Sequence, residues 1–163
     1  MKKALLLLTV VIGMTTHTFG QKIGLSFREA EQKGISTKNL DSIYEAAFDE
    51  DTSKGVFKTD EEQENLQKAY TKLLQDFGKF LYANNFYWEK PTRCFNRIYF
   101  NSDGTIDCFL YNFLGKTEED KPSEEKQKEF QKLLNQFIAD YKFSLTAKVK
   151  FAQCSPTTYM PKQ

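Results

Sequence analysis

The residues of this chain that could do chemistry are mostly carboxylates, because histidine is nearly absent. The one histidine, His17, lies in an amino-terminal stretch that we expect to be removed, so the mature chain of residues 21–163 would contain none. Ser/His/Asp hydrolases, Cys/His proteases and His-ligated zinc sites each need an imidazole at a defined place. The sequence therefore argues against these classes and leaves carboxylates, cysteines and binding surfaces as candidates.

The stretch most like a metal site is the acidic segment 49–60, which has the length of an EF-hand calcium loop and lies between two expected helices. The side chains at its ligand positions are Asp49, Asp51, Ser53 and Asp60. The glycine is misplaced, and Lys54 stands where such a loop must turn sharply. Calcium binding is therefore an alternative function, and an acidic loop between helices is the simpler interpretation. We expect no metal and no other cofactor.

A second alternative is a small secreted hydrolase without histidine, working with two carboxylates as glycosidases do. Asp107 is the only acid expected within a strand, where it lies opposite Tyr99 and beside Arg97. A cross-strand ion pair or hydrogen bond explains this placement as well. Because no feature of the sequence identifies a second acid, we expect a protein that is not an enzyme.

The amino terminus has the pattern of a secretory signal peptide at residues 1–20. Lys2 and Lys3 precede an apolar run at 4–14, which is too short to cross a bilayer, and small residues lead to an expected cleavage site after Gly20. We therefore expect an exported protein of a Gram-negative bacterium, periplasmic or secreted, with no transmembrane segment. Removal of the two lysines leaves 21 basic against 22 acidic side chains, a balance that argues against nucleic acid as a partner.

Three cysteines, Cys94, Cys108 and Cys154, leave at least one thiol unpaired. The expected hairpin register separates Cys94 from Cys108 by about 13 Å, at about 3.3 Å per residue, which is beyond disulfide reach. Any bridge would therefore include Cys154, and Cys94–Cys154 is the predicted pair. Three reduced, buried cysteines are an equal alternative.

The elements that position these residues centre on a β-hairpin from Cys94 to Phe113. Its tip, Asn101-Ser102-Asp103-Gly104, has the residues that a tight turn requires. Counting outward from the tip puts Ile98 opposite Cys108, so that one face is mostly aliphatic and should lie on helices. The other face either meets a partner or is covered by the amino-terminal helices, and its exposed aromatic set is Phe95, Arg97, Tyr99, Phe109, Tyr111 and Phe113.

Two amphipathic helices flank the hairpin. One begins at a capping box of Thr59 and Glu62 and runs over about 60–84, and the other runs over about 123–142. A final strand from Leu145 to about Ala152 alternates apolar and polar residues. A right-handed helical crossover would place it beside the first hairpin strand, antiparallel to it and on the sheet edge.

These elements predict an α+β fold with a three-stranded, or slightly larger, antiparallel sheet backed by the two helices. The expected organisation is a signal peptide at 1–20, a short helical amino-terminal segment at 21–59, the α+β domain at 60–155 and an irregular, proline-containing tail at 156–163.

The run Arg97–Leu110 with its Asp-Gly turn, the helix containing Lys132–Phe143 and the strand Ala147–Phe151 resemble the carboxy-terminal domain of TonB-type energy transducers, without that family's membrane anchor. The resemblance covers about residues 94–152. It implies a monomer or homodimer whose exposed third strand receives an extended peptide by β-augmentation. Applied to this chain, the peptide edge is Thr146, Lys148, Val149, Lys150 and Phe151. We therefore predict an exported, non-catalytic binding or envelope-associated protein whose partner is an envelope protein or peptide.

Overall fold

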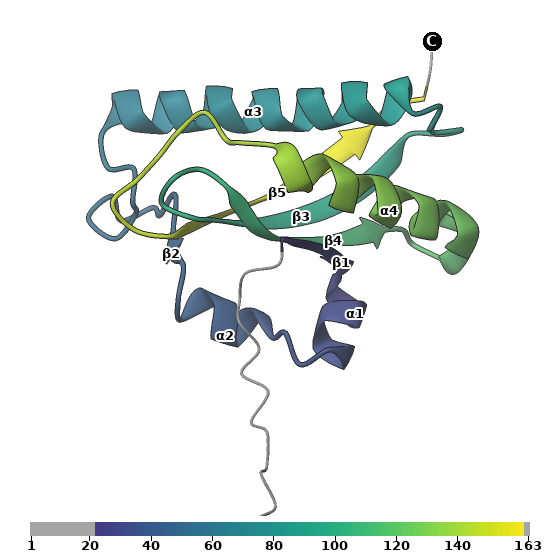
Figure 1. Ribbon diagram of the computed structural model, residues 1–163, viewed down its shortest axis with the longest axis horizontal. Helices are drawn as coiled ribbons and strands as arrows, with labels where there is room; N and C mark the ends of the chain where they lie inside the picture. Colours follow the sequence, from purple (N-terminus) through teal and green to yellow (C-terminus); the bar gives the residue numbers. More distant parts are fainter. Residues whose placement is uncertain (1–21, 162–163) are drawn as a thin grey trace, which may run out of the picture.

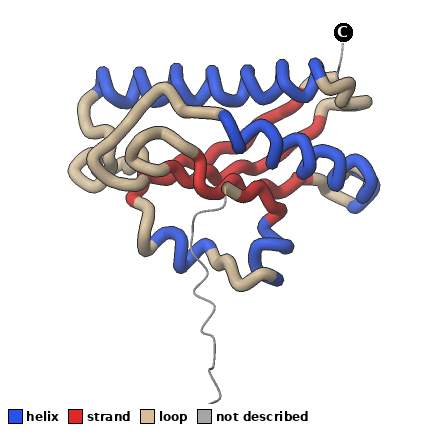
Figure 2. The backbone as a smooth tube through the Cα atoms, in the orientation of Figure 1, coloured by secondary structure: helices blue, strands red, loops and turns tan. Residues whose placement is uncertain are grey.

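The computed structural model describes residues 22–161, so the expected signal peptide lies outside the described residues. Its elements, in chain order, are β1 (Ile23–Ser26), α1 (Phe27–Gln32), α2 (Thr37–Asp41), β2 (Glu45–Ala46), α3 (Asp60–Ala83), β3 (Thr92–Phe100), β4 (Ile106–Leu114), a 3-10 turn (Glu118–Asp120), α4 (Glu124–Asp140) and β5 (Phe151–Tyr159). The five strands form one sheet in the order β1-β4-β3-β5-β2. The helices α3 and α4 cover the upper face of this sheet, and α1 and α2 lie below it (Figures 1 and 2).

The central hairpin forms with the predicted tip. The Asn101 N–H donates to the Thr105 C=O at 2.8 Å, and Gly104 has a positive φ of 86°. Only glycine fits this position without strain, because a Cβ there would also lie 2.7 Å from the Phe143 C=O. The turn chemistry of the sequence is therefore confirmed.

The predicted register of the hairpin is wrong beyond the first pair from the tip. Phe100 pairs with Ile106 but Tyr99 pairs with Cys108, so Asp107 is an extra residue on β4 and forms a β-bulge. Such a residue reverses the direction of the side chains that follow it, because side chains alternate along a strand. Ile98 therefore lies opposite Phe109 and not opposite Cys108.

The bulge overturns the predicted exposed aromatic face. Phe109, Tyr111 and Phe113 turn to the upper face and are buried beneath the long helices. Tyr99 stays on the lower face, as predicted, and is buried in a smaller cluster with residues of α1 and α2, so for this residue the alternative of a face covered by the amino-terminal helices is the one that holds. Of the predicted set, only Phe95 and Arg97 are partly exposed.

The predicted three-stranded antiparallel sheet is also wrong, because the sheet has five strands and is mixed. The two additional strands come from the amino-terminal segment 21–59: β1 runs parallel to β4, and β2 runs parallel to β5. Strands of four and two residues are too short to show an alternating pattern in the sequence. This segment is therefore part of the sheet as well as a pair of helices.

The final strand lies farther along the chain than predicted. Leu145–Lys150 is a loop tied to the hairpin tip, with the Ala147 N–H donating to the Ser102 C=O at 3.0 Å. The alternation of apolar and polar residues in this loop arises because Leu145 and Ala147 pack on the core while their neighbours face water. The strand is Phe151–Tyr159, which includes part of the predicted irregular tail, and it lies antiparallel beside β3 as the crossover argument predicts.

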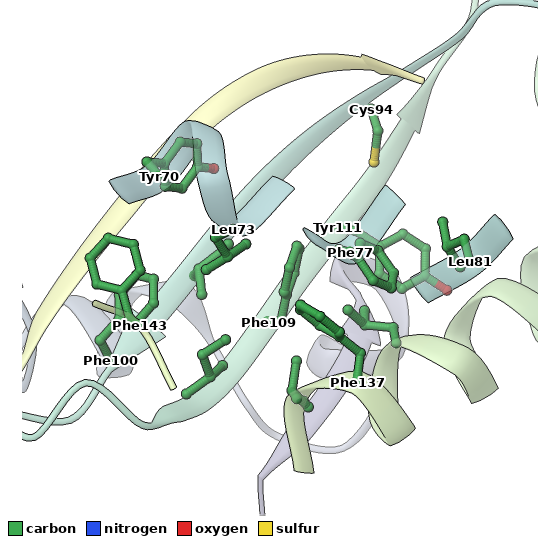
Figure 3. Packing of buried hydrophobic residues seen from close by; sticks show 14 of the residues in the cluster. Tyr70, Leu73, Phe77, Leu81, Cys94, Phe100, Phe109, Tyr111, Phe137 and Phe143 are labelled. Atoms are coloured by element: carbon green, nitrogen blue, oxygen red, sulfur yellow. The ribbon is translucent and has the colours of Figure 1, made fainter. Parts of the chain in front are cut away.

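The core is divided by the sheet into two clusters of different size. The upper cluster is large and aromatic, with Phe77, Phe109 and Tyr111 among its members (Figure 3). Phe130 of α4 is fully buried in this cluster, with its ring 5.0 Å from the Tyr111 ring and 5.4 Å from the Phe77 ring. The lower cluster is smaller, and its members are Leu25, Ala30, Leu40, Tyr44, Tyr99, Cys108 and Leu110. Burial of apolar area therefore anchors the sheet mainly from above.

Candidate functional site

The candidate site is the outer edge of β5, where the sheet lacks a neighbouring strand. β5 pairs with β3 along its whole length, but β2 pairs only with Phe151 and Ala152. Residues 153–158 therefore have a strand on one side only within the described range 22–161, and they carry no charged side chain. Because charges are a usual protection of a sheet edge, this edge is chemically open to pairing.

The backbone groups of every second residue on β5 point toward the open side. The Ala152 C=O accepts a 2.8 Å hydrogen bond from the residue that follows β2, so its groups face outward from β3. Directions alternate along an antiparallel ladder, and Cys154, Pro156 and Thr158 therefore face the same way. Among the described residues, the one partner recorded for these outward groups is the Gln153 side chain, which donates to the Cys154 C=O at 3.3 Å.

Pro156 occupies a position where proline leaves the sheet intact. It lies opposite Phe95 in the register, and its missing N–H falls on the open side, so no hydrogen bond to β3 is lost. The same proline removes one donor from the exposed edge. It is therefore the only one of the usual edge-blunting residue types within 153–158.

A pocket of about 280 Å³ opens on the lower face at the start of this edge. It is lined by Asp41, Tyr44, Ala46, Phe48, Arg97, Ala152, Gln153 and Cys154. The Phe48 ring is 49% exposed, and Arg97 is held in place by Asp41 at 2.6 Å. Because the ion pair is internally neutral, the pocket is suited to an uncharged side chain.

Two residues of the pocket lining, Asp41 and Tyr44, are held by hydrogen bonds between tyrosines and carboxylates. Asp41 also accepts from the Tyr99 hydroxyl at 3.1 Å, and Asp107 accepts from the Tyr44 hydroxyl at 2.6 Å and from Lys150 at 3.0 Å. Burial raises the pKa of Tyr99 and of Tyr44, and the hydrogen bond to Asp107 raises that of Tyr44 further. Both hydroxyls are therefore proton donors throughout the neutral range.

A second hollow, of about 390 Å³, lies on the upper face at the other end of the same edge. It runs between the carboxy-terminal half of α3 and the end of β5, and its lining is Leu74, Gln75, Gly78, Leu81, Tyr82, Phe86, Tyr87, Trp88, Thr157, Thr158, Tyr159, Met160 and Pro161. The exposed edge thus has a pocket below it at Cys154 and an apolar groove above it at Thr157.

The predicted peptide edge does not form, because Thr146, Lys148, Val149 and Lys150 belong to the loop before β5. Lys150 is engaged by Asp107, and Phe151 is buried in β5. The first three line a cleft of about 490 Å³ whose opposite wall includes Gly55 and Lys58. The structure therefore brings the predicted edge against the acidic segment 49–60, and the free strand edge lies elsewhere.

The acidic segment does not gather its oxygens around a point. The Asp51 carboxylate accepts from the Ser53 backbone and hydroxyl and pairs with Lys54 at 3.1 Å, while Asp60 is the first residue of α3. These contacts lower the pKa of Asp51, chiefly through the Ser53 hydroxyl. Across residues 22–161 no group of three or more His, Cys, Asp or Glu side chains could hold a metal ion.

The predicted disulfide is not formed, since all three cysteines are free thiols. Cys94 is buried on the upper face opposite Thr157, whereas Cys154 is exposed on the lower face opposite Arg97. Strict alternation along both strands separates the two sulfurs onto opposite faces of the sheet. The prediction failed because the strand that carries Cys154 lies farther along the chain than the sequence pattern indicates.

Sequence reasoning missed Asp41, Tyr44 and the edge at 153–158. Asp41 and Tyr44 flank the end of a helix of only five residues, and nothing in the sequence links them to the hairpin. The edge did carry a signal, since the run Phe151 to Tyr159 has no charge and is rich in β-forming residues.

Comparison of the chain with known protein families, with curated proteins and with solved structures finds no match. None of the helices in the described part of the chain is long and apolar enough to cross a membrane.

Proposed function

We propose that this protein is a non-catalytic binding protein that takes up an extended segment of another protein as an additional strand on the outer edge of β5. The observation that carries the proposal is the row of outward backbone groups at Cys154, Pro156 and Thr158, which lie beyond the end of β2. In β-augmentation such groups provide affinity, and pockets for alternate side chains provide specificity.

The two hollows beside the edge fit this binding mode. Successive side chains of an added strand point to opposite faces of the sheet. A guest residue beside Cys154 would face the lower pocket, and one beside Thr157 would face the upper groove. The same extended segment could therefore use both hollows without bending.

Two expectations from the sequence agree with this proposal. The signal peptide expected at residues 1–20 would place the protein in the periplasm or outside the cell, where its partner would be an envelope or secreted protein. The resemblance of residues 94–152 to TonB carboxy-terminal domains implies capture of a peptide by an exposed strand, and we assign this role to residues 153–158 of β5 in place of the edge Thr146–Phe151 expected from the sequence.

The test is a selection from a phage-displayed library of random linear heptapeptides against the mature chain 21–163, with Thr158→Pro as the matched control. Proline at 158 removes an outward N–H and leaves the bonds to β3 in place, so we expect the fold to persist and the selected peptides to be lost. Ser155→Pro removes an inward N–H and should instead destabilise β5. Peptides that bind the Thr158→Pro protein as well as the unaltered protein would refute the proposal.

A further inference from the structure

The lower face of the open edge carries a row of small side chains between β3 and the position of a guest strand. Paired residues of neighbouring strands share a face, so Cys154, Pro156 and Thr158 lie beside Arg97, Phe95 and Arg93 respectively. The three β5 side chains are exposed and short. Long side chains of β3 can therefore extend across β5 toward the guest.

The two arginines of this face are not equivalent. Arg97 is bound to Asp41 at 2.6 Å and forms part of the wall of the lower pocket. Arg93 is exposed, and no hydrogen bond or ion pair of its side chain occurs within residues 22–161. The positive charge available to a guest strand is therefore that of Arg93, at the Thr158 end of the edge.

The distance between β3 and a guest strand suits an arginine–carboxylate contact. Neighbouring strands lie about 4.8 Å apart, so a guest on the outer side of β5 lies about 10 Å from β3. An arginine side chain reaching over Thr158 and a glutamate or aspartate side chain reaching back from the guest span that distance together. Bidentate geometry would make arginine specific for a carboxylate here.

The Cys154 end of the edge favours a different side chain. Its pocket of about 280 Å³ has an exposed Phe48 ring and an arginine already neutralised by Asp41. An apolar or aromatic side chain would contact Phe48 and Tyr44 there without leaving a charge unpaired. Cys154 and Thr158 are four residues apart on β5, so the two guest residues that lie beside them are also four positions apart in the peptide.

From this arrangement we infer that the partner is an extended peptide with an acidic residue beside Thr158 and an apolar or aromatic residue four positions away beside Cys154, the acid being bound by Arg93. This inference rests on the proposed function. It also orients the guest, because an acid that precedes the apolar residue in the peptide sequence corresponds to an antiparallel guest strand.

The experiment repeats the heptapeptide selection on Arg93→Glu beside the unaltered chain, with Arg28→Glu on exposed α1 as a control for net charge. We expect acidic residues to be enriched four positions from an apolar one on the unaltered chain, and lysine or arginine to replace the acid on Arg93→Glu. Individual acidic peptides should bind Arg93→Glu about fivefold more weakly, as expected for loss and reversal of an exposed ion pair.

The outcomes separate the two claims. Peptides that are lost on Thr158→Pro but show no acidic position, or that bind Arg93→Glu unchanged, overturn the role of Arg93 and leave strand addition standing. A selection that yields no peptide, or only peptides indifferent to Thr158→Pro, overturns both. An equal loss of binding in Arg28→Glu would show a general effect of net charge and would also overturn the inference.

Discussion

The two edges of the sheet are protected very differently. At β1, the Asn135 side chain of α4 accepts from the Gly24 N–H at 2.9 Å and donates to the Gly24 C=O at 2.8 Å, so the outer groups of that strand are satisfied within the fold. At the other edge, β2 covers two residues of β5 and then the chain turns away. The outer backbone groups of Gly24 on β1 are therefore hydrogen-bonded, whereas within residues 22–161 the open stretch of β5 has only Pro156 as protection.

This difference shows that an open edge is not forced on the fold. β2 itself is covered on its outer side, because the Val56 and Phe57 N–H groups donate to the Ala46 and Ala47 C=O groups. Unpaired strand edges promote aggregation, so natural proteins generally close them. Since β1 and β2 are both covered on their outer sides, the uncovered stretch 153–158 of β5 is the position in the described sheet at which a partner strand is most easily accommodated.

The largest effect that distinguishes the two edges is expected from Gly24→Ala. A Cβ at Gly24 would lie 2.8 Å from the Leu134 side chain, so the substitution should push β1 away from α4 and cost about 1–3 kcal/mol. The matched change Gly78→Ala, in α3, meets nothing within 4 Å and should stabilise the helix by about 0.5–1 kcal/mol. Urea unfolding of both variants measures the change in the free energy of unfolding. A change of the same sign in both variants would contradict the tight contact between β1 and α4.

The next effect concerns the polar contacts that fasten the open edge to the sheet. Asp107→Ala removes the acceptor shared by Tyr44, which precedes β2, and Lys150, which precedes β5. We expect a loss of about 1–3 kcal/mol, because the Tyr44 hydroxyl is left without its acceptor. In the Asp107→Ala variant, the rate of amide hydrogen exchange should rise more at Ala47, beside β2, than at Gly24 of β1. Equal acceleration at both amides would show that Asp107 supports the whole sheet.

The sequence carried most information where local chemistry decides the structure. The Asn101–Gly104 turn and the Thr59–Glu62 capping box depend on neighbouring residues, and both form as predicted. The bulge at Asp107 could not be predicted from neighbouring residues, because the Asp107 side chain bonds Tyr44 and Lys150, which are distant in the sequence. One extra residue was enough to reverse the faces of Phe109 and Tyr111.

The candidate site was harder to predict than the hairpin. A proline in the stretch 151–159 argued for an irregular tail, since proline is excluded from central strands. It is tolerated here because its missing N–H points away from β3, which is a property of the assembled sheet. β1 and β2 could not be predicted, because strands of four and two residues are too short to show a periodic pattern.

A smaller effect, with a pH signature, is expected from Tyr44→Phe. The variant loses the hydrogen bond to Asp107 and should be about 1 kcal/mol less stable at pH 7. Burial and Asp107 raise the pKa of Tyr44 in the folded protein above the unfolded value of about 10. The stability from this hydroxyl is therefore complete below pH 10 and declines as pH rises above it, so the difference between the two proteins should shrink in alkaline solution. A difference that stays constant to high pH would exclude this linkage.

The smallest effect on stability is expected from substitution of Cys154, which is also the most direct chemical probe of the open edge. Its side chain is exposed, so Cys154→Ser should change the unfolding free energy by less than about 0.5 kcal/mol. Cys94 and Cys108 are buried, and burial raises the pKa of each thiol to about 12. In the folded, reduced protein a thiol reagent should therefore label Cys154 rapidly and the other two only upon unfolding.

A label at Cys154 also tests what the edge does. The Cys154 thiol lies on the lower face, at the wall of the 280 Å³ pocket. A bulky maleimide adduct should therefore obstruct the position that a guest strand would occupy beside β5. We expect the adduct to abolish capture of the selected heptapeptides, whereas Cys154→Ser, which preserves the backbone groups and has a slightly smaller side chain, should retain it. Peptide binding that survives the adduct would move the binding surface away from β5 and leave its open edge without a partner strand.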